Sequence, residues 1–137
     1  MVMKKWIYVG YFLTEQSRNW LLSLIKDNIP EGWKIYLDHM TYVFNDGSEE
    51  TQKTYEMVKT YFGENQKLHI DAIGLSDRAL AFRVVEKNLT KNALAHITIA
   101  VAPEAKPVES NYITNWEKIF DNGQTLEVLT TLKEYVR

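Results

Sequence analysis

The sequence contains a short apolar run, Leu94-Ala95-His96-Ile97-Thr98-Ile99-Ala100-Val101, that two polar side chains interrupt. Its β-branched residues favour a strand over residues 94–101. Because side chains alternate between the two faces of a strand, His96 and Thr98 project to one side and the larger apolar residues to the other. We therefore expect one face of this strand to pack on a core and the other face to carry chemistry.

The same arrangement occurs earlier, in Trp33-Lys34-Ile35-Tyr36-Leu37-Asp38-His39-Met40-Thr41-Tyr42-Val43-Phe44. We expect a strand over residues 33–44 in which His39 and Thr41 share one face. A single His-x-Thr pattern carries little information, because threonine is common in strands. Two such patterns, each within a predicted strand, favour a functional role for both.

The remaining segments surround these two strands. Thr14 and Ser48 are suitable helix caps, and Gly63 is placed to end the second helix. The predicted elements are, in order, a strand at 4–12, a helix at 14–28, the strand at 33–44, a helix at 48–62, a hairpin of 68–75 and 79–85, the strand at 94–101, a loop at 103–107, a short helix at 112–120 and a closing strand at 125–135.

This order of elements predicts an α+β domain in which helices cover the outside of an antiparallel sheet. A length of 137 residues suits one domain, residues 1–137. The segment between the two His-x-Thr patterns is long enough to build one lobe of the domain and bring the chain back. The two motif strands can therefore face each other across a cleft.

Composition excludes several functions. The chain has no cysteine, which excludes disulfides, thiolate zinc sites and a cysteine nucleophile. The formal net charge of -2 argues against a long nucleic-acid interface, because such binding requires many Lys and Arg contacts to phosphates. No apolar run is long enough to span a bilayer, and the first residues do not resemble a signal peptide. We expect a cytoplasmic protein, a monomer that does not associate with membranes.

Paired histidines suit the cleavage of a phosphodiester. One imidazole can take a proton from the attacking oxygen while the other gives a proton to the leaving oxygen, and each threonine hydroxyl can donate a hydrogen bond to a phosphate oxygen. The pattern does not decide which histidine is the acid and which is the base. His69 has no threonine two residues later, so we expect a structural or surface role for it, and the histidine spacing supports neither a metal site nor a cofactor.

The two patterns, His39-Met40-Thr41-Tyr42 and His96-Ile97-Thr98-Ile99, resemble those of the two-histidine (2H) phosphoesterase superfamily. The segment 106–111 is similar to the cyclic phosphodiesterase domains of tRNA ligases. The resemblance implies a bilobal α+β fold with antiparallel sheets lining a central cleft, and metal-independent hydrolysis of a nucleotide phosphodiester. His39, Thr41, His96 and Thr98 would be its catalytic residues.

The resemblance implies a set of substrates, of which an RNA 2′,3′-cyclic phosphate end is our first choice. The alternatives are a 2′-5′ oligoadenylate or a cyclic oligonucleotide defence signal, or a non-catalytic nucleotide-binding module. The expected partner is a nucleotide or an RNA end. The candidate substrate contacts, chosen for an aromatic face, a positive charge or the tRNA-ligase likeness, are Tyr8, Tyr11, Arg83, Lys106, Ser110 and Asn111.

Overall fold

The structure is a computed structural model that describes residues 4–137. It confirms an α+β fold with few helices and an antiparallel sheet. The strands are β1 (Trp6–Leu13), β2 (Lys34–Ile35), β3 (His39–Phe44), β4 (Asn65–Leu75), β5 (Ala79–Val84), β6 (His96–Val101), β7 (Trp116–Lys118) and β8 (Leu126–Val136). The α-helices are α1 (Glu15–Ile25) and α2 (Glu49–Val58), and the 3-10 helices are η1 (Lys26–Asn28), η2 (Lys59–Tyr61), η3 (Lys87–Leu89) and η4 (Pro107–Tyr112).

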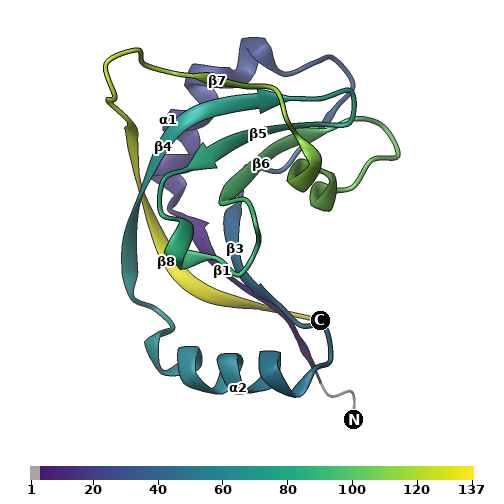
Figure 1. The fold of residues 1–137 in the computed structure, drawn as a ribbon, viewed down its shortest axis with the longest axis vertical. Helices are drawn as coiled ribbons and strands as arrows, with labels where there is room; N and C mark the ends of the chain where they lie inside the picture. The colour runs from purple at the N-terminus through teal and green to yellow at the C-terminus, as the bar shows by residue number, and fades with distance from the viewer. Residues whose placement is uncertain (1–3) are drawn as a thin grey trace.

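The strands form one continuous sheet in the order β2-β6-β5-β4-β8-β1-β3, with β7 paired to β4. The expectation of more than one sheet is therefore replaced by a single bent one. The long strands β4 and β8 run through both the upper and the lower part of Figure 1 and join them. The predicted hairpin is present as β4 and β5, with Leu75 opposite Leu80.

The two ends of the sheet, β2 and β3, are consecutive in the chain. The predicted strand at 33–44 is interrupted between them, because Leu37 takes a left-handed backbone conformation with φ of 48°. Leu37 N–H donates to the carbonyl of Thr98 (2.9 Å), and Leu13 N–H donates to the carbonyl of Asp38 (2.8 Å). This link thus holds β6 on one side and β1 on the other, and β3 lies within contact distance of β6.

The helices begin at the predicted caps. Thr14 accepts from the backbone N–H of Ser17 (3.2 Å), and Ser48 accepts from that of Thr51 (3.2 Å). Helix α2 lies along the lower end of the sheet (Figure 1), where Tyr55 stacks on Trp6 with centroids 4.5 Å apart. None of the helices among residues 4–137 is long and apolar enough to cross a membrane.

The core is built from both halves of the sheet and from α1. Met40, Ile97 and Ile99, which alternate with the motif residues, are almost fully buried, whereas Tyr42 is only partly buried. The core side chains with no more than 1% of their surface exposed include Val9, Leu21, Leu37, Met40, Leu68, Ile70, Ile97 and Ile99.

The predicted short helix at 112–120 is wrong. A 3-10 helix, η4, precedes it from Pro107, partly within the predicted loop, and residues 116–118 form strand β7. The cause is tertiary, because β4 has a free edge beyond β8 on which β7 pairs. Trp116 packs directly on Gly74, where a Cβ atom would come within 2.5 Å of the indole ring. Strand β6 begins at His96, two residues later than predicted.

Candidate active site

The first motif lies on strand β3, which pairs with β1. In this register Thr41 is opposite Gly10 and His39 is opposite Phe12. The imidazole of His39 leans over β1, where a Cβ atom on Gly10 would lie 3.1 Å from His39 Cδ2. A glycine inside a strand often marks such a close approach, and here it makes room for the ring of His39.

Aromatic rings surround the imidazole of His39. Tyr8 stacks on it with centroids 4.5 Å apart and planes 17° apart, and the ring of Phe12 lies 5.0 Å away. His39 Nε2 lies 3.2 Å from Thr41 Oγ1, while Nδ1 is buried and has no hydrogen-bond partner among residues 4–137. Burial, with a smaller contribution from the positive charge that His96 can carry, lowers the pKa of His39 to about 4. His39 is therefore neutral at pH 7 in the free protein.

The second motif places His96 on β6 with a fixed ring orientation. His96 Nδ1 lies 2.8 Å from the backbone carbonyl of Leu94. Because a carbonyl can only accept, Nδ1 carries a proton, and in the neutral ring Nε2 keeps its lone pair. Burial lowers the pKa of His96, and the carbonyl of Leu94 opposes this shift. Neutral His96 is thus prepared to accept a proton at Nε2.

Thr98 is held by the segment after β6. Its hydroxyl lies 2.8 Å from the hydroxyl of Ser110 and 3.4 Å from the carbonyl of Pro107. Ser110 has no exposed surface, so the predicted direct contact between Ser110 and substrate is replaced by a contact with Thr98. Helix η4 therefore fixes the position of the second motif's threonine.

The fold brings the two motifs near each other. Strands β3 and β6 are in contact, and the charge of His96 acts on the pKa of His39. Two imidazoles and two hydroxyls thus belong to one polar region between the ends of the sheet. Such an arrangement can accept one proton, donate another and hydrogen-bond an anion between them.

Three other residues predicted to contact the substrate are Arg83, Lys106 and Asn111. Arg83 is opposite His96 on β5, but Asp71 accepts two hydrogen bonds from its guanidinium (3.0 and 3.2 Å). Much of the charge of Arg83 is therefore already compensated. Lys106 is exposed at the start of η4, and the side chain of Asn111 donates to the carbonyl of Val108 (3.0 Å).

Of the two tyrosines of β1, only Tyr8 lies on the His39 face. Tyr11 is 8% exposed and lies on the opposite face, where its ring meets Tyr42 edge-on at 6.3 Å. It lines a hollow of about 710 Å³ together with residues of α2 and η2. This position does not support a contact between Tyr11 and a ligand held by His39.

Sequence reasoning missed Gly10 and Phe12 as neighbours of His39. Gly10 gave a usable signal, because an isolated glycine in an aromatic strand indicates that another group approaches the backbone. Phe12 gave none, since its pairing with His39 depends on the register between β1 and β3, which includes a bulge next to Gly10.

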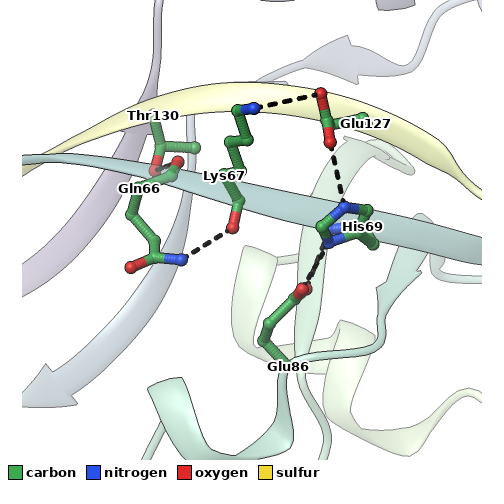
Figure 2. Close-up of polar contacts among 6 residues, drawn as sticks. All are labelled: Gln66, Lys67, His69, Glu86, Glu127 and Thr130. Atoms are coloured by element: carbon green, nitrogen blue, oxygen red, sulfur yellow. Dashed lines mark hydrogen bonds and ion pairs between the residues drawn. The ribbon is translucent and has the colours of Figure 1, made fainter.

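The third histidine lies between two carboxylates on neighbouring segments, as Figure 2 shows. His69 Nδ1 lies 2.5 Å from Glu86, whose other oxygen accepts from the His69 backbone N–H (2.8 Å). His69 Nε2 lies 3.1 Å from Glu127, which also pairs with Lys67 at 3.8 Å. The hydrogen bond to Glu86 raises the pKa of His69 most, and Glu127 adds to the effect. This cluster joins β4 to β8 and to the segment after β5.

Residues 4–137 contain no group of three or more His, Asp or Glu side chains arranged to hold a metal ion.

Comparisons with known proteins identify the family to which this chain belongs. The model of the fungal tRNA ligase phosphodiesterase domain matches residues 23–133, which is most of the chain. The chain therefore belongs to this family of phosphodiesterase domains, and the resemblance to the 2H phosphoesterases is confirmed. A search of curated proteins found no match.

The fold is also similar to a solved structure, described as "Crystal Structure of Fungal RNA Kinase". The TM-score is 0.56 with 16% sequence identity, and the alignment covers 98% of this chain and 43% of that chain. The chain thus spans less than half the length of this neighbour, and the likeness concerns the fold.

Proposed function

We propose that this protein is a metal-independent phosphodiesterase that hydrolyses the 2′,3′-cyclic phosphate end of an RNA. The observation that carries the proposal is that β3 and β6, the strands of the two His-x-Thr motifs, are in contact. The link before β3 is attached to β6 by the hydrogen bond from Leu37 N–H to the carbonyl of Thr98. The matched family is named for the phosphodiesterase domain of fungal tRNA ligases, which supports an RNA end as the substrate.

In this proposal His96 is the general base. Its Nδ1 proton is engaged by Leu94, so Nε2 takes a proton from water as the water oxygen bonds to phosphorus. One bond between phosphorus and a ribose oxygen breaks, and protonated His39 gives its proton to that oxygen. The hydroxyls of Thr41 and Thr98 hydrogen-bond the non-bridging oxygens, on which negative charge accumulates.

His39 must gain a proton before it can act as the acid. In the free protein burial and His96 keep its pKa near 4. A bound phosphodiester brings a negative charge to the imidazoles and thereby raises the pKa of both. Substrate binding and protonation of His39 are therefore coupled.

The test is turnover in EDTA of a panel of substrates: RNA 2′,3′-cyclic ends, 2′-5′ oligoadenylate and cyclic oligonucleotides. The variants are His39→Ala and His96→Ala, with His69→Gln as a matched control, because His69 pairs with Glu86 and Glu127 instead. We expect turnover of cyclic ends by the wild type and by His69→Gln, and a loss of at least about a hundredfold in the other two.

Full turnover in both motif variants would overturn the acid–base roles. Turnover of only 2′-5′ oligoadenylate or a cyclic oligonucleotide would keep the chemistry and reassign the substrate. Tight binding without turnover of any member would leave a nucleotide-binding module.

A further inference from the structure

Three neighbouring strands present an ordered grid of side chains around His39. Strands β3, β1 and β8 are paired side by side, and the residues opposite one another share a face. The rows across this face are Phe44, Tyr8 and Tyr135; then Thr41, Gly10 and Lys133; then His39, Phe12 and Thr131. Besides the motif residues, the grid contains an aromatic row and a lysine.

The aromatic row is exposed at both ends. Phe44 is 56% exposed and Tyr135 is 39% exposed, although both are large apolar rings on a sheet. Tyr135 stacks on Tyr8 with centroids 5.1 Å apart, and Tyr8 in turn stacks on His39. A row of aromatic rings thus leads from the imidazole to solvent, and such rings can stack with nucleobases.

Lys133 lies beside this row. Its side chain is exposed, and no carboxylate of residues 4–137 lies within 4 Å of its ammonium, unlike those of Lys53 or Lys59. Only Gly10 separates Lys133 from Thr41 in their row, so the Cα atoms of Lys133 and Thr41 are two strand spacings, about 10 Å, apart. This distance places the lysine beyond the phosphate that the motif residues bind.

Positive charge continues on the other side of the aromatic row. Lys5 and Arg137 pair through two backbone hydrogen bonds (3.1 and 3.0 Å), and both residues are exposed. Aromatic rings flanked by cations are the usual means of binding a single strand of nucleic acid, since each base has a flat face and each nucleotide carries a phosphate.

We propose that Lys133 and Tyr135 form a subsite for the penultimate nucleotide of the RNA, the one before the nucleotide whose ribose carries the cyclic phosphate. Lys133 pairs with the phosphate that links these two nucleotides, and the penultimate base stacks on Tyr135. This inference rests on the proposed function, and it specifies the substrate as an RNA end of at least two nucleotides rather than a cyclic mononucleotide.

The experiment compares kcat/KM for a dinucleotide that ends in a 2′,3′-cyclic phosphate with kcat/KM for the cyclic mononucleotide. The variants are Lys133→Gln, Tyr135→Ala and Tyr135→Phe, which keeps the ring. Lys53→Gln is the control, because Lys53 is 74% exposed on α2, against the opposite face of the sheet. Melting temperatures confirm that each variant is folded.

We expect the wild type to prefer the dinucleotide. The ratio of the two kcat/KM values should fall about tenfold in Lys133→Gln and in Tyr135→Ala, the effect of losing one phosphate contact or one base stack. Tyr135→Phe and Lys53→Gln should keep the wild-type ratio. The salt dependence of the dinucleotide reaction should also weaken in Lys133→Gln.

A wild-type ratio of one, or an equal fall on both substrates in Lys133→Gln, would overturn the subsite while the proposed function stands. If the wild type turns over neither substrate, the proposed function fails. Calorimetric titration with a linear dinucleotide 3′-phosphate and with the corresponding mononucleotide then tests the subsite separately. Equal affinities of wild type and Lys133→Gln for the dinucleotide would overturn it.

Discussion

The phenol ring of Tyr8 lies almost parallel to the imidazole of His39, with centroids 4.5 Å apart. The contact joins the middle strand of this face, β1, to the motif strand β3. Burial, with a smaller contribution from nearby Asp38, raises the pKa of Tyr8 to about 12, so the phenol stays neutral throughout the physiological range. Tyr8 thus supplies a neutral flat surface that restrains the ring of His39.

Replacing Tyr8 should therefore affect His39. Tyr8→Ala removes the stacked ring and should lower kcat on the cyclic mononucleotide about tenfold, because the imidazole becomes free to rotate. Tyr8→Phe retains the ring and should stay within about twofold of the wild type. Steady-state kinetics of the two variants checks this, and an equally large loss in Tyr8→Phe would show that the hydroxyl, not the ring face, matters.

Gly10→Ala should damage catalysis more than folding. The added methyl would lie 3.1 Å from both His39 Cδ2 and the Met40 carbonyl, so the imidazole must move by a few tenths of an ångström. Misplacement of a catalytic group by about 1 Å can cost about a hundredfold, and a smaller shift should cost roughly tenfold in kcat. The measurement is kcat together with the free energy of unfolding, which should change by no more than about 1 kcal/mol. Unchanged kcat in a folded variant would contradict the close-approach argument.

Ser110 should act only through Thr98. Ser110→Ala leaves the Thr98 hydroxyl without its 2.8 Å partner, and we expect kcat to fall severalfold and stability to fall by about 1 kcal/mol. A double-mutant cycle with Thr98→Val tests the route, because Ser110→Ala should then have little further effect on kcat. Independent, multiplicative losses would indicate that Ser110 influences turnover by another path.

Acid should destabilise the protein through His39. The folded pKa of about 4 lies below 6.5, the ordinary pKa of histidine, so between these values the unfolded chain binds more protons and stability rises with pH. His39 alone should cost on the order of 3 kcal/mol as the pH falls from 6.5 to 4. His69 acts in the opposite direction, because its raised pKa stabilises the fold at low pH and this contribution is lost as the pH rises.

Urea unfolding from pH 4 to pH 7 isolates the His39 contribution as the difference between the wild type and His39→Gln. The difference in unfolding free energy should grow with pH up to about 6.5 and then level off. A difference that does not vary with pH would mean that His39 has an unperturbed pKa.

Local sequence patterns were enough to predict much of this fold. Alternation along residues 94–101 and 33–44 placed both motifs on strands with an apolar opposite face, and Ile97 and Met40 are indeed buried. The caps at Thr14 and Ser48 and the hairpin at Ser76 depend on neighbouring residues only, so they too could be predicted. The short helix at 112–120 failed because pairing with the free edge of β4 overrides local propensity.

The sequence by itself determined which side chains share a face of a strand, because a period of two is a local property of the extended backbone. It therefore placed His39 with Thr41 and His96 with Thr98. Only the tertiary structure decided what lies opposite each face. The choice of Tyr8 over Tyr11, the space that Gly10 leaves for His39 and the place of Lys133 in the row of Thr41 all depend on register between strands. The burial of Ser110 depends on the packing of η4 against β6. Register is fixed by bulges and by packing between segments far apart in the chain, and local sequence does not contain it.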